Sequence, residues 1–141
     1  MDEQRDYLER LLKTFRVAAL ITVSTDGAPS ARPMLTLGDV STREIWFMTR
    51  LDTEKGRNIQ SNPNVGIYFA TDGDQRYVSL RGRAEIIRDR ELIRTRWTEQ
   101  LQRWFRQGPD TPNLALVKVV PHEAEYWDER TNREERVTLA S

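Results

Sequence analysis

Two spacings of apolar positions divide the chain into helical and extended segments. Within residues 1–16 the apolar side chains recur every three or four positions, which predicts an amphipathic N-terminal helix. The same spacing from Leu92 to Phe105 predicts a second amphipathic helix that begins near Asp89. A shorter and more polar helix is predicted over residues 53–60.

The other apolar segments are rich in β-branched and aromatic residues and are bounded by turns, as strands are. Asp26-Gly27 is typical of a hairpin turn. Pro33 cannot donate a ladder hydrogen bond, so it marks an edge, a bulge or a ligand-facing irregularity. Gly82 lies within a long predicted strand, where a sheet can bend sharply. The predicted strands occupy residues 16–25, 29–37, 44–49, 65–70, 76–87, 114–121 and 123–128.

The order of these elements favours a mainly β fold. Six or seven strands follow one another with few helices between them, which predicts a β-barrel of mostly antiparallel strands with flanking helices rather than a parallel α/β sheet. A length of 141 residues suits a single domain over residues 1–141. The polar segment 129–141 is expected to form a frayed tail or to take part in dimer contacts.

The composition narrows the function classes. Lysine and arginine total 22 and are balanced by 22 acidic residues, so the charge gives no reason to expect nucleic acid or an anionic membrane as a partner. The sequence contains no cysteine, which excludes disulfides, zinc–thiolate sites, iron–sulfur clusters and a cysteine nucleophile. His122, the single histidine, does not support a triad or a histidine metal site. No apolar stretch approaches membrane-spanning length, so a cytoplasmic location is expected.

The stretch FMTRLDTEK, residues 47–55, places a cation where a helix disfavours one. Asp52 and Thr53 are suitable N-caps, yet Lys55 lies in the first turn, at the positive end of the helix dipole. The free backbone N–H groups at a helix start bind phosphate readily. The stretch therefore indicates an anion site at Thr49, Thr53 and Lys55, unless Lys55 merely points into solvent.

Arg32 would strengthen this anion site. It precedes Pro33 on the second predicted strand. If that strand pairs with residues 44–49, the Arg32 side chain lies near Lys55, and an arginine, a lysine and a helix start together suit a phosphate. The alternative is that Arg32 forms an ordinary surface ion pair.

Four stretches in order along the chain resemble the pyridoxamine 5′-phosphate oxidase-like family, and most closely its general stress protein branch. They are RPMLTL at 32–37, WFMTRLDTEKGRNIQSNPNVGIYFA at 46–70, YVSLRGRAEIIRDRE at 77–91 and WFRQGPDTPNLALVKVVPHEAEYWD at 104–128. The resemblance implies a split β-barrel of the FMN-binding type. It also implies a homodimer with flavin sites at the subunit interface.

The resemblance implies roles at the phosphate end of the flavin. Arg32 corresponds to the arginine that meets the FMN phosphate, and Thr53 and Lys55 to the hydroxyl and the lysine at the helix start. The true oxidases carry further cations where this chain has Leu37 and Glu54. They also end in an arginine–x–histidine substrate element that this chain lacks, which argues against pyridoxamine phosphate oxidation.

The resemblance also places two strands beside the flavin ring. Pro33 and Met34 correspond to the strand whose backbone follows the ring. Phe47, Met48 and Thr49 correspond to the next strand, which lines the ring and the ribityl chain.

Two tryptophans allow two interpretations. Trp104 and Trp127 suit packing in the core or in a dimer, because large aromatic side chains contribute strongly to burial. In the family this region can approach the flavin from the partner subunit, so Trp104 is also a candidate lid.

Together these features predict a homodimeric, FMN-dependent oxidoreductase that exchanges electrons with a small-molecule donor or acceptor. The first alternative is a flavin-binding or sensing module without turnover, and the second is a structural or interaction unit whose site has decayed. FAD and the deazaflavin F420 are the alternative cofactors.

Overall fold

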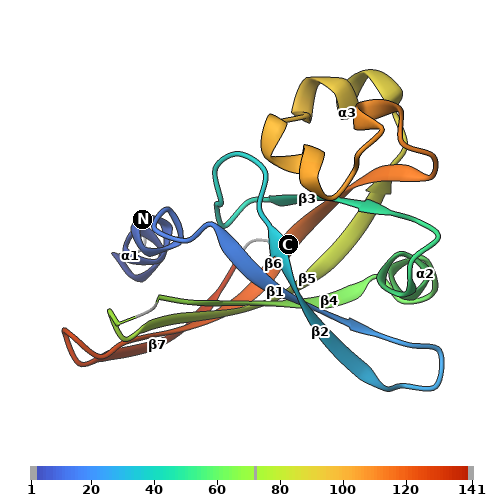
Figure 1. Cartoon of the computed structure of the whole chain (residues 1–141). Coiled ribbons are helices and arrows are strands. Elements are labelled where there is room, and N and C mark those ends of the chain that lie inside the picture. The colour runs from blue at the N-terminus through green and yellow to red at the C-terminus, as the bar shows by residue number, and fades with distance from the viewer. Residues whose placement is uncertain (1–2, 72, 140–141) are drawn as a thin grey trace.

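The computed structural model describes residues 3–71 and 73–139. Seven strands in this part of the chain form one sheet, and all of its ladders are antiparallel (Figure 1). The elements are α1 (Glu3–Leu12), β1 (Val17–Val23), β2 (Pro29–Leu35), β3 (Ile45–Arg50), α2 (Glu54–Ser61), β4 (Asn64–Ala70), β5 (Arg76–Ile87), α3 (Arg90–Arg96), the 3-10 turns η1 (Glu99–Arg103) and η2 (Gly108–Asp110), β6 (Leu114–Asp128) and β7 (Arg133–Thr138).

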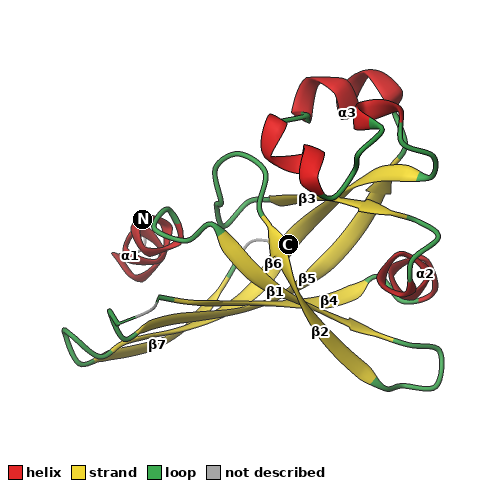
Figure 2. Cartoon of the chain, viewed as in Figure 1, coloured by secondary structure: helices red, strands yellow, loops and turns green. Residues whose placement is uncertain are grey.

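The sheet curls until its two ends meet. Its strands lie in the order β2-β1-β4-β5-β6-β3, and β7 pairs with β6 off this path. Beyond the end of β2, the Leu37 N–H donates to the Trp46 carbonyl of β3 at 2.9 Å, which joins the first strand to the last. The predicted β-barrel with flanking helices is therefore confirmed, and the helices lie outside the sheet (Figure 2).

Strand β3 separates two apolar clusters, because successive side chains of a strand point to opposite faces. Ile45 and Phe47 point into the main core of the barrel, where α1 also buries Leu8 and Leu12. Trp46 and Met48 point outward, into a second cluster beneath α3 and η1. The position of Pro33 at an edge is confirmed too, since β2 ends the path of the sheet.

The predicted helix does begin at Asp89, which caps α3, but the prediction of one continuous helix is wrong, because the segment breaks after Arg96. Trp97 has extended backbone angles, and the chain continues as η1. The rings of Trp97 and Phe105 lie 6.3 Å apart. Residues eight positions apart on a continuous helix would be separated by about 12 Å along its axis. The break therefore lets both rings pack against the second cluster.

The prediction of a frayed polar tail over residues 129–141 is also wrong within the described residues. Strand β7 pairs with β6 along its whole length, and Val137 is only 2% exposed. Arg133 lies 3.9 Å over the Tyr7 ring and pairs with Glu3, so the strand also fastens α1. The alternating apolar residues Val137 and Leu139 explain the burial, while residues 140 and 141 lie outside the described part.

Gly82 lies at an irregularity in the ladder between β5 and β6. The register shifts between Arg81 and Gly82, opposite Pro121. A Cβ atom on Gly82 would lie 2.6 Å from the Val120 carbonyl oxygen, which only glycine permits. The two strands predicted at 114–121 and 123–128 are therefore one strand with an irregularity.

The helix predicted within residues 1–16 is present but shorter than expected, and α1 ends at Leu12.

Candidate functional site

The start of α2 is fixed against the end of β3. The Thr53 hydroxyl caps the helix by accepting from the Gly56 N–H at 3.3 Å, and it donates to the Arg50 carbonyl at 2.7 Å. A Cβ on Gly56 would lie 2.6 Å from that same carbonyl oxygen and 2.7 Å from the Leu51 Cα. Glycine is thus required for this close approach, which places the next side chains of the helix beside the barrel.

Arg32 reaches this helix start from β2. Its Nη1 donates to the Thr22 hydroxyl oxygen at 2.6 Å, and that oxygen also accepts from the Asn58 amide at 3.0 Å. Its Nη2 lies 3.4 Å from a Glu54 carboxylate oxygen. Because Thr22 is fully buried and joins β1, β2 and α2, it holds the Arg32 guanidinium in one place.

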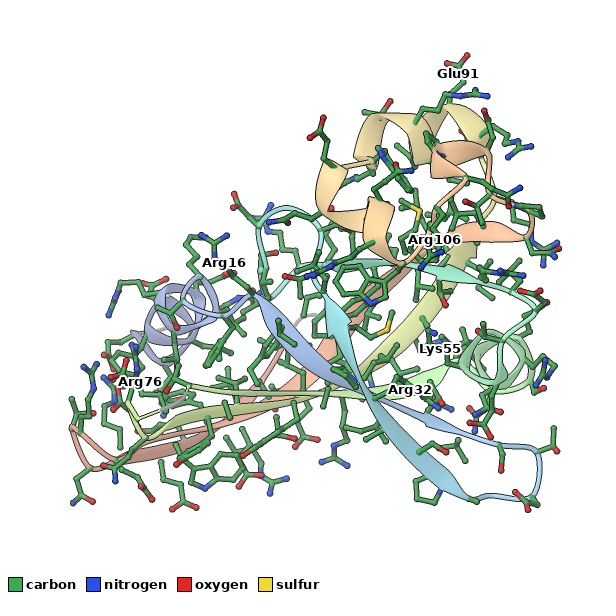
Figure 3. The ribbon with its side chains drawn as sticks, in the orientation of Figure 1. Arg16, Arg32, Lys55, Arg76, Glu91 and Arg106 are labelled. Carbon is green, nitrogen blue, oxygen red and sulfur yellow. The ribbon has the colours of Figure 1, made fainter. Side chains whose placement is uncertain are left out.

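Lys55 is a half-buried cation next to Arg32 (Figure 3). Burial lowers the pKa of Lys55 below the usual value for lysine, and the positive charge of Arg32 lowers this pKa further. Within residues 3–71 and 73–139 no side chain forms a hydrogen bond or an ion pair with the Lys55 ammonium group. Two neighbouring cations, one of them without a counter-ion, form a site that an anion would stabilise.

An apolar cavity of about 340 Å³ opens beside Lys55. Arg50, Thr53 and Lys55 form its polar end. Its remaining walls are apolar side chains from β1, β2, β3 and the segment around η1: Val17, Pro33, Met34, Leu35, Met48, Leu101, Trp104 and Phe105. A cationic end on an apolar cavity suits a flat aromatic ligand that carries an anionic arm.

Five of the eight residues predicted for the site line this cavity: Pro33, Met34, Met48, Thr53 and Lys55. Arg32 adjoins it through Lys55. The other two, Phe47 and Thr49, are buried and do not line it. The Phe47 ring belongs to the barrel core, on the face of β3 opposite Met48. Only the backbone of Phe47 could therefore face a ligand.

The two threonine hydroxyls are engaged with the backbone. The Thr49 hydroxyl lies 3.5 Å from the Arg50 carbonyl, and the Thr53 hydroxyl donates to the same oxygen. The Thr53 hydroxyl could donate to a ligand only if its hydrogen bond to the Arg50 carbonyl were broken. The structure thus gives Thr53 the role of a cap.

The ladder between the second strand and residues 44–49, which was the condition for placing Arg32 near Lys55, is absent from the described residues. β2 pairs with β1, and β3 pairs with β6, so that the single Leu37–Trp46 bridge is the link between β2 and β3 in the described residues. Arg32 nevertheless lies near Lys55, because the hydrogen bonds through Thr22 draw α2 against the β1–β2 pair.

The anchors of Arg32 were not predicted from the sequence. Thr22 lies in an apolar strand and Asn58 in a helix, both at buried positions. A polar residue at such a position was the sequence signal that could have identified these two anchors. Arg50 was not predicted either, although it lies within the stretch 47–55 and lines the cavity. Of the two tryptophans, Trp104 lines the cavity, whereas Trp127 does not.

Replacing Thr22 with valine is expected to loosen Arg32. The substitution keeps the shape of the side chain but removes the acceptor of two hydrogen bonds. Leaving the buried Asn58 amide without this partner should lower the free energy of unfolding by about 1–2 kcal/mol. Urea unfolding of Thr22→Val beside Thr138→Val, at an exposed threonine of β7, measures the effect, and equal loss in both variants would contradict the anchoring role.

Two other kinds of site find no support in the described residues. No cluster of histidine, aspartate and glutamate in this part of the chain could hold a metal ion. Within the same residues no helix has both the length and the apolar character needed to cross a membrane.

Comparison with known proteins identifies relatives along the whole domain. A family model described as "Pyridoxamine 5'-phosphate oxidase like" matches residues 3–139. General stress protein 26 of Bacillus subtilis is 35% identical over 127 residues, which cover 85% of this chain and 87% of that protein.

Solved structures share the fold. A protein of Clostridium acetobutylicum related to general stress protein 26 has a TM-score of 0.83 at 19% identity, with 98% of this chain and 96% of that chain covered. A pyridoxamine 5′-phosphate oxidase-related, FMN-binding protein of Nostoc punctiforme has a TM-score of 0.74 at 15% identity, covering 100% and 98%. An F420 reductase has a TM-score of 0.64 at 26% identity, covering 82% and 94%. With a split β-barrel fold and a family match over nearly its full length, the chain belongs to the pyridoxamine 5′-phosphate oxidase-like family.

Proposed function

We propose that this protein binds FMN in the cavity beside Lys55 and acts as a flavin-dependent oxidoreductase. The observation that carries the proposal is the half-buried, uncompensated ammonium group of Lys55 beside the anchored guanidinium of Arg32, at the end of an apolar cavity. A phosphate would compensate the charge of Lys55 and could also pair with Arg32, and the apolar walls would take the isoalloxazine ring.

The lining residues suit binding and orientation. Pro33, Met34 and Met48 would contact the ring, while Arg32 and Lys55 would hold the phosphate. When bound, the flavin supplies the hydride or electron transfer. Arg50 and Lys55 are the titratable groups among the lining residues. Since both are cations, the site favours exchange with small electron donors or acceptors over acid–base chemistry on a substrate.

A second copy of the chain is proposed to cover an exposed apolar surface beside the cavity. Val17, Tyr68 and Trp104 are 56%, 40% and 59% exposed, which is high for large apolar side chains. Val17 and Trp104 line the rim of the cavity, and Tyr68 pairs with Ala19 beside Pro33. A homodimer over β1 and β2 would bury this face and close the cavity.

A titration of the purified protein tests the proposal. FMN fluorescence should change with a saturable dependence on protein concentration, and sedimentation of the same sample should give the mass of a dimer. FAD and F420 titrated in parallel rank the alternative cofactors. A folded dimer that leaves FMN, FAD and F420 unbound at high micromolar concentration would overturn the proposal in favour of a structural unit.

A flavin-binding or sensing module without turnover is the second candidate. The acidic Glu54 beside Arg32 favours it, because a carboxylate next to the proposed phosphate weakens the hold on the flavin that sustained turnover would need. Steady-state oxidation of NADH or NADPH by the FMN-loaded protein, with an added electron acceptor, separates the two candidates. Sustained turnover would exclude the module.

A further inference from the structure

The Arg32 guanidinium already has an anionic neighbour in this chain. Glu54, the first residue of α2, places a carboxylate oxygen 3.4 Å from Arg32 Nη2. The Arg32 side chain is 19% exposed and the Glu54 side chain is 67% exposed. The arginine is therefore shielded, whereas the glutamate approaches it from the solvent side.

The arginine cannot easily turn away from this neighbour. Its Nη1 is bound to the buried hydroxyl of Thr22 at 2.6 Å. The Nη2 group is then the part of the guanidinium that faces outward, and it faces Glu54. An incoming anion that seeks a paired hydrogen bond with Arg32 must therefore displace the carboxylate or share the guanidinium with it.

Glu54 also changes the charge of the whole anion site. Arg32 and Lys55 each contribute one positive charge, and Glu54 cancels one of them. The neighbouring Arg50 is already paired with Asp52 at 2.7 Å. A phosphomonoester carries nearly two negative charges above about pH 6. Arg32, Lys55 and Glu54 thus carry a net charge of one, which neutralises only part of the phosphate charge. The Glu54 carboxylate also repels the phosphate directly.

From this arrangement we infer that Glu54 is the specificity-determining residue of the anion site, acting as an internal competitor for Arg32. It weakens the binding of a dianionic phosphomonoester while leaving the binding of the uncharged part of the ligand unchanged. The inference rests on the proposed binding of FMN in this cavity.

Glu54 has an ordinary structural role as well. An acidic residue in the first turn of a helix interacts favourably with the helix dipole. That role affects the stability of α2 whatever the ligand carries. Competition for Arg32, by contrast, affects only a ligand that bears a phosphate, and this difference separates the two roles.

The test compares FMN with riboflavin, which lacks the phosphate. The ratio of the two dissociation constants, riboflavin over FMN, measures what the phosphate contributes. In Glu54→Gln this ratio should rise about tenfold, because a charge repulsion near the protein surface is removed. Glu91→Gln is the matched control, since Glu91 is also an exposed glutamate in the first turn of a helix, far from the anion site (Figure 3).

Each outcome is informative. A raised ratio in Glu54→Gln with an unchanged ratio in Glu91→Gln supports the inference. If the wild-type protein binds FMN but Glu54→Gln leaves the ratio as it is, the inference fails and the proposed function stands. If neither flavin binds the folded wild-type protein, both are overturned.

Discussion

Replacing Lys55 with methionine is expected to weaken FMN binding by roughly 10- to 100-fold, the range for losing one charged hydrogen bond to a phosphate. Methionine keeps an unbranched apolar stem, so the wall of the cavity is retained while the charge is lost. Riboflavin should bind both proteins equally, because it brings no anion to the site. Parallel fluorescence titrations with the two flavins measure the effect.

The same substitution should not destabilise the flavin-free protein. Within the described residues the Lys55 ammonium group has no hydrogen bond or ion pair to lose. Removing it also removes a half-buried charge and its repulsion by Arg32. We therefore expect an unchanged or higher free energy of unfolding in urea, together with loss of the stabilisation that FMN gives by binding the folded state.

The pH dependence has a definite sign. Because the pKa of Lys55 is lowered in the folded protein, the unfolded chain binds more protons between the folded and the ordinary lysine pKa. The stability of the flavin-free protein should therefore gain from Lys55 as the pH rises through this window. FMN affinity should fall over the same window, since the lysine loses its charge. Both trends should be absent in Lys55→Met.

Lys13→Met is the matched control, because Lys13 is exposed and does not line the cavity. It should leave the riboflavin-to-FMN ratio at the wild-type value. If Lys55→Met also leaves this ratio unchanged, the phosphate does not lie at Lys55, and the proposed orientation of the flavin is wrong.

The fold could be predicted because its signals are local. Alternating apolar residues and turn residues define the strands, and the opposite faces of Trp46 and Phe47 follow from the period of a strand. The predictions that failed depended on distant contacts. The break after Arg96 and the pairing of β7 with β6 are set by partners far along the chain, which a local pattern does not contain.

The anion site could likewise be predicted only where its signal is local. Lys55 could be identified because its charge conflicts with the local preference of a helix start. The location of Arg32 beside it depends on hydrogen bonds among β1, β2 and α2, which no spacing in the sequence reveals. Arg32 was expected near Lys55 on the condition of a ladder between residues 29–37 and 44–49, whereas the described residues contain the single Leu37–Trp46 bridge between these segments.

Gly56 is expected to give the largest loss of stability among the substitutions near the site. Helix propensity alone predicts that Gly56→Ala stabilises the protein by up to about 1 kcal/mol, since alanine is the better helix former. The structure predicts the opposite sign. The new Cβ would lie 2.6 Å from the Arg50 carbonyl oxygen and 2.7 Å from the Leu51 Cα, and backbone atoms cannot move aside as a side-chain end can.

The net result should be a loss of about 3 kcal/mol in the free energy of unfolding, the upper part of the range for overpacking. The start of α2 would have to move away from β3, which would stretch the bond between Thr53 and the Arg50 carbonyl and displace Lys55. FMN binding should therefore weaken together with stability. Urea unfolding and flavin titration of the same variant measure both effects.

Gly66→Ala is the control that separates the backbone clash at Gly56 from the general effect of replacing a glycine with alanine. Gly66 lies in β4, where a Cβ would meet the Ile21 Cδ1 at 3.4 Å, the mobile end of a side chain. This variant should change the free energy of unfolding by less than about 1 kcal/mol, because such a contact can relax by a small shift. If Gly56→Ala is as stable as Gly66→Ala, the helix start can move without cost. In that case the rigid attachment of α2 to β3 does not position Lys55, and the lysine must owe its place to Thr22 and Asn58 alone.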